Sequence, residues 1–278
     1  MERIDALRQI AAQAQEGELI FPTGLDLAMK LVRQLDDPEC HVDQAAKLIK
    51  NDPLISARAL AVANSAIYNR SGQPISDVRH AVARIGLRMT RSLAVAIATR
   101  QMAGEPKTPQ LRQAAAQLWS HTAHVAALAQ VIARRITHLD PETAFFAGIV
   151  HEIGGFYLIS RAAEFPSLID GEPADWAEHA EPLIGRSILN KLAVPANVIE
   201  ALERTWEGLL SLPPVSLSDT LLLANELAPV TSPLHDRKEG ALLHQTHIID
   251  AAVDDAFISS ILAESASEVE SLSKALQF

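Results

Sequence analysis

Apolar side chains recur with a helical period along most of this chain. Between residues 4 and 15 they return every three or four positions, which predicts an amphipathic helix. Runs rich in Val, Ile, Thr and aromatic residues, which would favour strands, are missing. The hydrophobic pattern therefore predicts an all-α fold.

Cap residues and prolines divide this pattern into separate helices. Asp52-Pro53 and Asp140-Pro141 each place a cap residue before a first-turn proline, an arrangement typical of a helix start. Ser76 is expected to cap a helix that Gly86 then breaks. We predict helices over about 4–15, 24–35, 53–64, 77–85, 87–102, 111–137, 141 onward, 174–192, 196–206, 215–228 and 255–275.

A Pro- and Gly-rich stretch, Gly104–Pro109, separates two helical blocks and is the best candidate for a linker. We therefore expect two packed lobes, a small helical bundle over 1–105 and a second helical lobe over 106–278. Residues 229–240, with the sequence PVTSPLHDRKEG, are expected to form a surface loop.

Composition limits the classes of partner and the cellular compartments that we expect for the protein. Hydrophobic residues make up 48% of the 278 residues, enough for a packed core. A net charge of −10 argues against nucleic-acid binding, because phosphates would be repelled. The single Cys40 fits a reducing compartment, and apolar runs such as Leu93–Thr99 are too short to span a bilayer. We expect a cytoplasmic protein without membrane insertion or a signal peptide.

One group of residues has the spacing of a metal site. His151 is followed directly by Glu152, and His121 lies on the preceding long predicted helix. Imidazole nitrogens and a carboxylate together suit Fe, Mn or Zn. A later helix, with the run LLLANELA, presents Asn225 or Glu226 as a further candidate ligand.

The run Ala59–Ala96 resembles the signature of the HDOD family, which are bacterial signalling domains related to the HD metal-dependent phosphohydrolases. The resemblance is carried by the ANSAIY core at 63–68, by Pro74-Ile75-Ser76, and by the spacing from Ala81 to Gly86. The runs LWSHTAHVAALAQVIAR and ETAFFAGIVHEIGGFYL continue it. It covers roughly residues 18–230 and implies that the second lobe is HD-like and that both lobes form one continuous unit.

The resemblance implies a half-preserved metal site. His121 matches the first histidine of the HD pattern and His151 the histidine of its doublet, whereas Glu152 and Asn225 stand where the enzymes have Asp. A neutral Asn225 removes an anionic ligand, and ligand charge is part of what activates metal-bound water. We therefore expect a vestigial site with no bound metal or cofactor.

Further positions depart from the family pattern. Glu181 stands where a histidine often precedes the glycine matching Gly185, and Thr205-Trp206 replaces a frequent His-His pair. His124 and His179 lie nearby but out of register. The ligands for a second metal ion are thus missing.

Two other groups of residues attract a functional interpretation. Asn64, Ser65 and Tyr68 belong to the family signature, and we expect them to be structural. Basic side chains at i, i+4 and i+7 could bind an anion or an acidic partner; the alternative is a solvated face paired with acidic residues of neighbouring helices. These basic residues are Arg84, Arg88 and Arg91.

These observations predict a non-catalytic signal-transduction or scaffolding module that acts through a protein partner. The alternatives are a metal-dependent phosphohydrolase with unusual ligands and a small-nucleotide sensor that uses the vestigial site. The sequence names neither the partner nor the pathway.

Overall fold

The computed structural model describes residues 2–21, 25–168, 171–208, 211, 213–235 and 256–277. Every regular element within these ranges is a helix, which confirms the all-α prediction. The elements are α1 (Arg3–Gln15), α2 (Leu25–Leu35), α3 (Val42–Lys50), α4 (Pro53–Ala63), α5 (Val78–Gln101), α6 (Pro109–Ile132), a π turn η1 (Ala133–Thr137), α7 (Pro141–Val150), α8 (Ile153–Arg161), a 3₁₀ turn η2 (Pro166–Leu168), α9 (Pro173–His179), α10 (Glu181–Lys191), α11 (Ala196–Glu207), α12 (Leu217–Leu227) and α14 (Ala256–Leu276).

Side-chain caps begin several of these helices where local sequence signals place them. The Asp52 carboxylate accepts hydrogen bonds from the backbone N–H groups of Leu54 (2.9 Å) and Ile55 (3.1 Å), at the start of α4. Asp140 accepts in the same way from Glu142 at the start of α7. The predicted cap Ser76 is displaced by one residue, because Asp77 accepts from the His80 N–H and caps α5.

Gly86 interrupts α5 as predicted. Its φ of 82° lies in the left-handed region, which glycine enters without the steric cost that a Cβ would bring. The helix therefore continues after a kink, and its two halves point in different directions.

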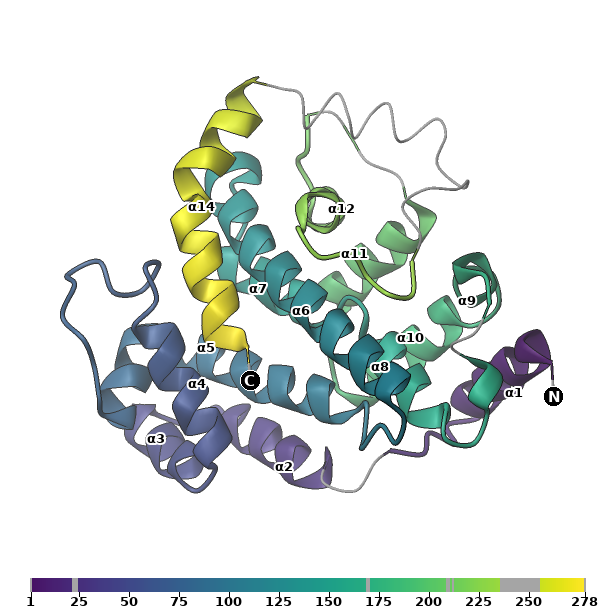
Figure 1. The fold of residues 1–278 in the computed structure, drawn as a ribbon. Coiled ribbons are helices and arrows are strands. Elements are labelled where there is room, and N and C mark those ends of the chain that lie inside the picture. The colour runs from purple at the N-terminus through teal and green to yellow at the C-terminus, as the bar shows by residue number, and fades with distance from the viewer. Residues whose placement is uncertain are drawn as a thin grey trace.

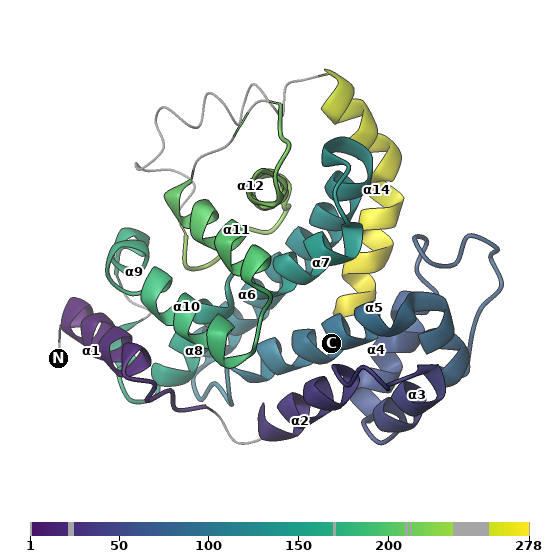
Figure 2. The same cartoon turned by 180° about the vertical axis from the view of Figure 1, so that it is seen from behind.

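The helices form two groups (Figure 1). Helices α2 to α5 pack together in the first group, and helices α6 to α12 pack together in the second. Helix α1 packs against α9 and α10, so it lies on the second group although the sequence assigns it to the first lobe. The C-terminal α14 runs along both α6 and α4 and so joins the two groups (Figure 2). The lobe boundary near residue 105 stays a prediction.

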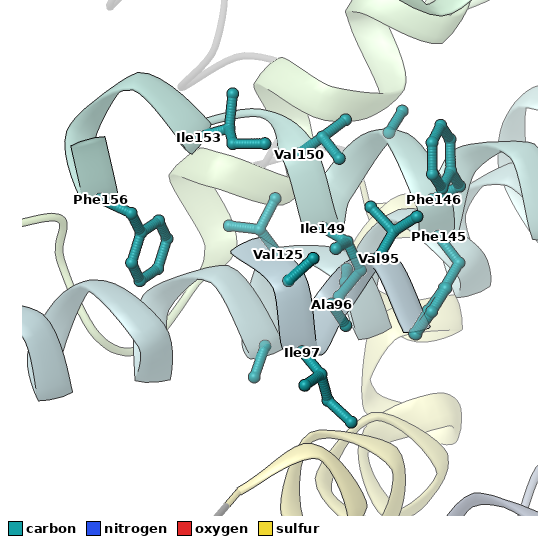
Figure 3. Close-up of a cluster of buried hydrophobic side chains, with 14 of the residues drawn as sticks. Val95, Ala96, Ile97, Val125, Phe145, Phe146, Ile149, Val150, Ile153 and Phe156 are labelled. Carbon is teal, nitrogen blue, oxygen red and sulfur yellow. The ribbon is translucent and has the colours of Figure 1, made fainter. Parts of the chain in front are cut away.

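The core is centred on α5, α6, α7 and α8 (Figure 3). Buried side chains from these helices fill it, including Val95, Val125, Ile149 and Phe156. Helices α6 and α7 approach very closely at Gly148, where an added Cβ would lie 2.6 Å from the Cα of Ala126. Glycine at this position therefore sets the distance between α6, which carries His121, and α7, which leads into the turn with His151 and Glu152.

Two predicted helices are divided in the structure. The expected helix 174–192 is two helices, α9 and α10, because Ala180 has a non-helical backbone (φ −143°, ψ −37°). The helix expected to carry His151 and Glu152 ends at Val150, and the two residues form the turn before α8. This turn directs both side chains towards α6.

One stretch, Pro141–Arg161, is long and apolar enough to cross a membrane by composition alone. In the structure it is α7, a turn and α8, and 83% of its most apolar 18-residue portion is buried inside the molecule. Core helices of folded proteins meet the same criterion, so this stretch is weak evidence for a membrane span.

Candidate functional site

Three predicted ligands meet in the interior. His121 comes from α6, and His151 and Glu152 from the turn between α7 and α8. The Nε2 atoms of the two histidines are 3.3 Å apart, and they lie 3.6 Å and 3.9 Å, respectively, from Oε2 of Glu152. The side chains of His121 and Glu152 are only 1% and 5% exposed. We call these three residues the triad.

Backbone carbonyls set the orientation of both imidazoles. His121 donates from Nδ1 to the carbonyl of Val230 (2.8 Å), and His151 donates from Nδ1 to the carbonyl of Gly148 (2.7 Å). Because a carbonyl only accepts, each Nδ1 carries the proton and a neutral ring presents a bare Nε2 to the triad. Burial lowers the pKa of His151 to about 4, against the opposing charge of Glu152, so this ring is neutral at pH 7.

Glu152 contributes a carboxylate whose two oxygens have different surroundings. Oε1 accepts a hydrogen bond from Nδ1 of His235 (2.6 Å), whereas the buried Oε2 has no hydrogen-bond partner among the described residues. Burial acts to raise the pKa of Glu152, but the hydrogen bond from His235 and the positive charge of that ring outweigh it and hold the pKa far below its usual range. The group is therefore ionised.

The triad fits a single divalent ion. Three acceptor atoms face one another without a donor between them, which is unfavourable unless a proton or a cation lies there. A circle through three atoms with these separations has a radius of about 2.1 Å, the usual length of a Zn–N or Zn–O bond. The carbonyl partners on Nδ1 match the outer contacts of metal-bound histidines. His121, His151 and Glu152 would hold the ion; the expected absence of a metal stays a prediction.

The segment Ala228–His235, which we call the closing segment, crosses over the triad. It was predicted to be part of a surface loop; residues 229–235 do form a loop without regular structure, with Pro229 and Thr231 exposed, but part of this loop is buried, and 236–240 lies outside the described residues. Ser232 and Leu234 are buried, and the Val230 carbonyl binds His121. The backbone of Gly155 leaves room for Leu234, because a Cβ there would overlap the Leu234 side chain.

His235 at the end of the closing segment is a site residue that the sequence analysis missed. Its Nδ1 donates to Glu152 and its Nε2 to Oε2 of Glu181 (2.9 Å). Burial acts to lower the pKa of His235, but the charge of Glu181 and the bonds to both carboxylates raise it well above the usual value. The ring is therefore a cation between two carboxylates.

The positions expected to lack second-metal ligands are occupied by other contacts. Glu181 binds His235, and the Thr205 hydroxyl donates to the carbonyl of Leu202 (2.6 Å). The Trp206 ring covers Gly185, where an added Cβ would lie 2.9 Å from the ring. Each of these side chains thus contacts another part of the chain.

The remaining histidine and amide candidates lie outside the triad. His124 donates to the Ser120 carbonyl within α6 (2.7 Å), and His179 is the last residue of α9. Asn225 lies on α12, three residues before the closing segment begins at Ala228. The role inferred for Asn225 from the family resemblance stays a prediction.

The family-signature residues make contacts within the fold. The side-chain amide of Asn64 bonds both backbone polar groups of Ile75, and Ser65 donates to the Val62 carbonyl (2.6 Å). The Tyr68 hydroxyl accepts from Gln130 (2.9 Å). Burial raises the pKa of Tyr68 to about 12, against the opposing effect of this hydrogen bond. These contacts favour the structural interpretation.

Arg84, Arg88 and Arg91 each have partners within the chain. Arg84 donates to the carbonyls of Ala63 (3.1 Å) and Gln73 (3.2 Å). Arg88 binds Asp140 and Thr143 on the α7 side, and Arg91 binds Asp36 (3.0 Å) and lies over the Phe146 ring. These contacts favour a solvated face on which Arg88 and Arg91 pair with acidic residues, and anion or partner binding stays a prediction.

Two cavities in the described part of the chain lie away from the triad. One, of about 310 Å³, lies between the end of α5 and the start of α6, and it includes Arg100 and Arg112. The other, of about 260 Å³, lies beside Arg88 and Arg91. Neither is lined by a triad residue, so neither leads a substrate to the candidate metal ligands.

Comparisons with known proteins agree with this architecture. The family model of the HDOD domain matches residues 21–203. No curated protein sequence matches the chain.

Several solved structures share the fold. A protein of Shewanella amazonensis, provisionally named a metal-dependent phosphohydrolase, has a TM-score of 0.75 at 24% identity, over 98% of both chains. An HDOD domain protein of unknown function from Geobacter sulfurreducens has a TM-score of 0.64 at 19% identity, also over 98% of both chains. A provisionally named signal transduction protein of Marinobacter aquaeolei has a TM-score of 0.64 at 16% identity, over 100% of this chain and 67% of that one. At such identities the likeness establishes the fold alone.

Proposed function

We propose that this chain, which belongs to the HDOD domain family, is a non-catalytic signal-transduction module that acts by binding another protein. We place it in the cytoplasm, in keeping with its one cysteine, Cys40, which is free and buried.

The closure of the triad carries this proposal. The closing segment lies over it, with the Val230 carbonyl on His121 and the His235 ring on Glu152. A hydrolase must let a phosphate and a water molecule reach its metal, which requires an open coordination position. The triad side chains are no more than 10% exposed. This burial supports the interpretation of the triad as a structural centre and not as a reaction site.

The chemistry of the surrounding residues supports the same conclusion. Clamping a transferring phosphate between two ions needs a second set of ligands. Glu181 is instead bonded to His235, and Trp206 is packed on Gly185. A single ion at the triad would be held by two neutral imidazoles and one carboxylate.

A second candidate function is a metal-dependent phosphohydrolase. It is favoured by the spacing of the triad, since two histidines and one carboxylate suit a single Fe, Mn or Zn ion. Such an ion supplies a Lewis acid and an activated water when bound. This alternative requires the closing segment to move away from Glu152.

The two functions are separated by one combined experiment. The purified protein is assayed against cyclic dinucleotides and a generic phosphodiester, with Mn, Fe, Mg or Zn supplied. A strain that lacks the gene is then complemented with a folded His121→Ala, His151→Ala double variant. We expect no metal-dependent turnover and full complementation.

The control is a His41→Ala, His80→Ala double variant, which removes two exposed histidines away from the triad. Turnover that disappears in the triad variant alone would establish the hydrolase. Failure of the folded triad variant to complement, while the control succeeds, would also contradict the non-catalytic proposal.

A further inference from the structure

His235 connects two elements that are distant in the sequence. One nitrogen of its ring bonds Glu152, in the turn before α8, and the other bonds Glu181, the first residue of α10. Both carboxylate side chains are nearly buried, at 5% and 10% exposure, whereas the His235 ring is 36% exposed. The ring thus closes the outer side of a buried acidic pair.

The bond to His235 determines which way Glu152 faces. A free carboxylate on a two-methylene arm samples several rotamers, and both of its oxygens are equivalent. Here Oε1 is held by His235, and the opposite oxygen, Oε2, is directed at the Nε2 atoms of His121 and His151. This buried oxygen has no other hydrogen-bond partner among the described residues.

The same bond holds the closing segment in place. Along this segment, the contacts near the triad are the Val230 carbonyl on His121, Leu234 against Gly155, and His235 on the two carboxylates. Val230 binds the first ligand and His235 the third. The segment is therefore attached to the triad at two points, Val230 and His235.

We propose that His235, anchored by Glu181, is a positioning residue that orients Glu152 as a ligand and latches the closing segment over a divalent transition-metal ion held by the triad. Metal-bound ligands commonly depend on such outer partners, whose loss weakens metal affinity about 10- to 100-fold. The latch adds a kinetic effect, because a covered ion leaves slowly. This inference goes beyond the proposed function and stands whether or not the protein is an enzyme.

Cobalt(II) is the probe, because its visible absorption reports the number and geometry of its ligands. Affinity is measured by titration, and release is measured as decay of that absorption after excess EDTA is added. We expect His235→Ala to bind Co²⁺ about 10- to 100-fold more weakly, to release it faster and to show an altered spectrum. His235→Arg, which keeps a cation that can donate to both carboxylates, should restore most of the affinity.

Two variants locate the effect. His121→Ala should abolish the Co²⁺ spectrum, and His80→Ala, an exposed histidine on α5, should behave as wild type. Where His235→Ala does not fold by circular dichroism, Glu181→Gln replaces it, since it removes the charge of the outer anchor; it should weaken affinity and speed release in the same direction.

The proposal is overturned if wild type binds no Co²⁺ or if His121→Ala binds it equally well. It is also overturned if folded His235→Ala, or Glu181→Gln in its place, matches wild type in affinity, release and spectrum. These outcomes leave complementation by the triad variant unaffected. The experiment therefore fails or succeeds separately from the proposed function.

Discussion

The side-chain amide of Asn64 forms two hydrogen bonds with the backbone of Ile75. Its Oδ1 accepts from the Ile75 N–H and its Nδ2 donates to the Ile75 carbonyl, both at 2.7 Å. Asn64 is the C-terminal cap of α4, and Ile75 lies eleven residues further along, shortly before α5. The amide thus supplies hydrogen-bond partners for backbone groups of the loop between these helices, which would otherwise lack them.

Replacing this amide should destabilise the fold. Asn64→Ala leaves both backbone groups of Ile75 unpaired, and we expect the free energy of unfolding to fall by about 1–3 kcal/mol. Asn64→Asp should also destabilise, because a carboxylate cannot donate to the Ile75 carbonyl. Urea denaturation followed by circular dichroism measures both, with the exposed Asn51→Ala as control. An unchanged midpoint for Asn64→Ala would contradict the structural role.

Gly155 is predicted to be essential for seating the closing segment. A Cβ at this position would overlap Leu234 and lie 3.2 Å from a methyl group of Leu118. We expect Gly155→Ala to lower stability by about 1–3 kcal/mol through overpacking. In a Leu234→Ala background, thermal melts should give a smaller penalty for the same change, because the obstructing side chain is gone. Equal penalties in both backgrounds would show that Leu234 does not pack there.

Asp219 should make stability depend on pH in the acid range. Burial acts to raise the pKa of Asp219, but backbone hydrogen bonds from Ser211, Ser216 and Val215 and the Ser216 hydroxyl lower it overall. A lowered folded pKa stabilises the fold above the unfolded value of about 3.9, and this stabilisation is lost as pH falls through the folded pKa. We expect Asp219→Asn to cost roughly 1.5–3 kcal/mol at pH 7.

The difference between wild type and Asp219→Asn should therefore shrink as the pH falls below about 4. Urea midpoints measured between pH 7 and pH 3 test this, with the exposed Asp5→Asn on α1 as control. A difference that is constant with pH would mean that the charge of Asp219 does not contribute.

Local signals were sufficient to predict most of the helices. Asp52-Pro53 and Asp140-Pro141 begin α4 and α7 because a cap needs only residues two or three positions away. The break at Gly86 was also predictable from a local signal, because a glycine by itself allows the positive φ found there. The split at Ala180 has no side-chain cap, and its local signal, Pro182 in the first turn of α10, was not used in the sequence analysis.

The site was predicted only in part, because its last members meet over long sequence distances. His121, His151 and Glu152 follow a recognisable spacing, and the structure brings them together. His235 lies 83 residues from Glu152 in a stretch whose prolines and charges resemble a surface loop. A signal does exist there: the stretch has apolar residues at Ala228, Val230 and Leu234 among its prolines, and Ala228 and Leu234 are buried in the structure.

Glu268 of α14 joins the C-terminal helix to the end of α6. It binds both Arg134 and Arg135, in the π turn η1, and the Arg134 and Glu268 side chains are only 26% and 23% exposed. Since surface pairs contribute at most about 1 kcal/mol and breaking buried pairs costs about 3–5 kcal/mol, Glu268→Ala should cost roughly 1–3 kcal/mol. It leaves two adjacent, half-buried arginines without their shared carboxylate. Hydrogen exchange should then speed up along α14 more than in the α5 core.

The matched control for this prediction is Glu270→Ala on the same helix. Glu270 pairs with Lys274 at the surface, with 66% of its side chain exposed, so its loss should leave exchange in α14 nearly unchanged. If both variants loosen α14 equally, the effect is not specific to the arginine contacts. If neither does, α14 is held by apolar packing such as that of Leu272 and Leu276 alone.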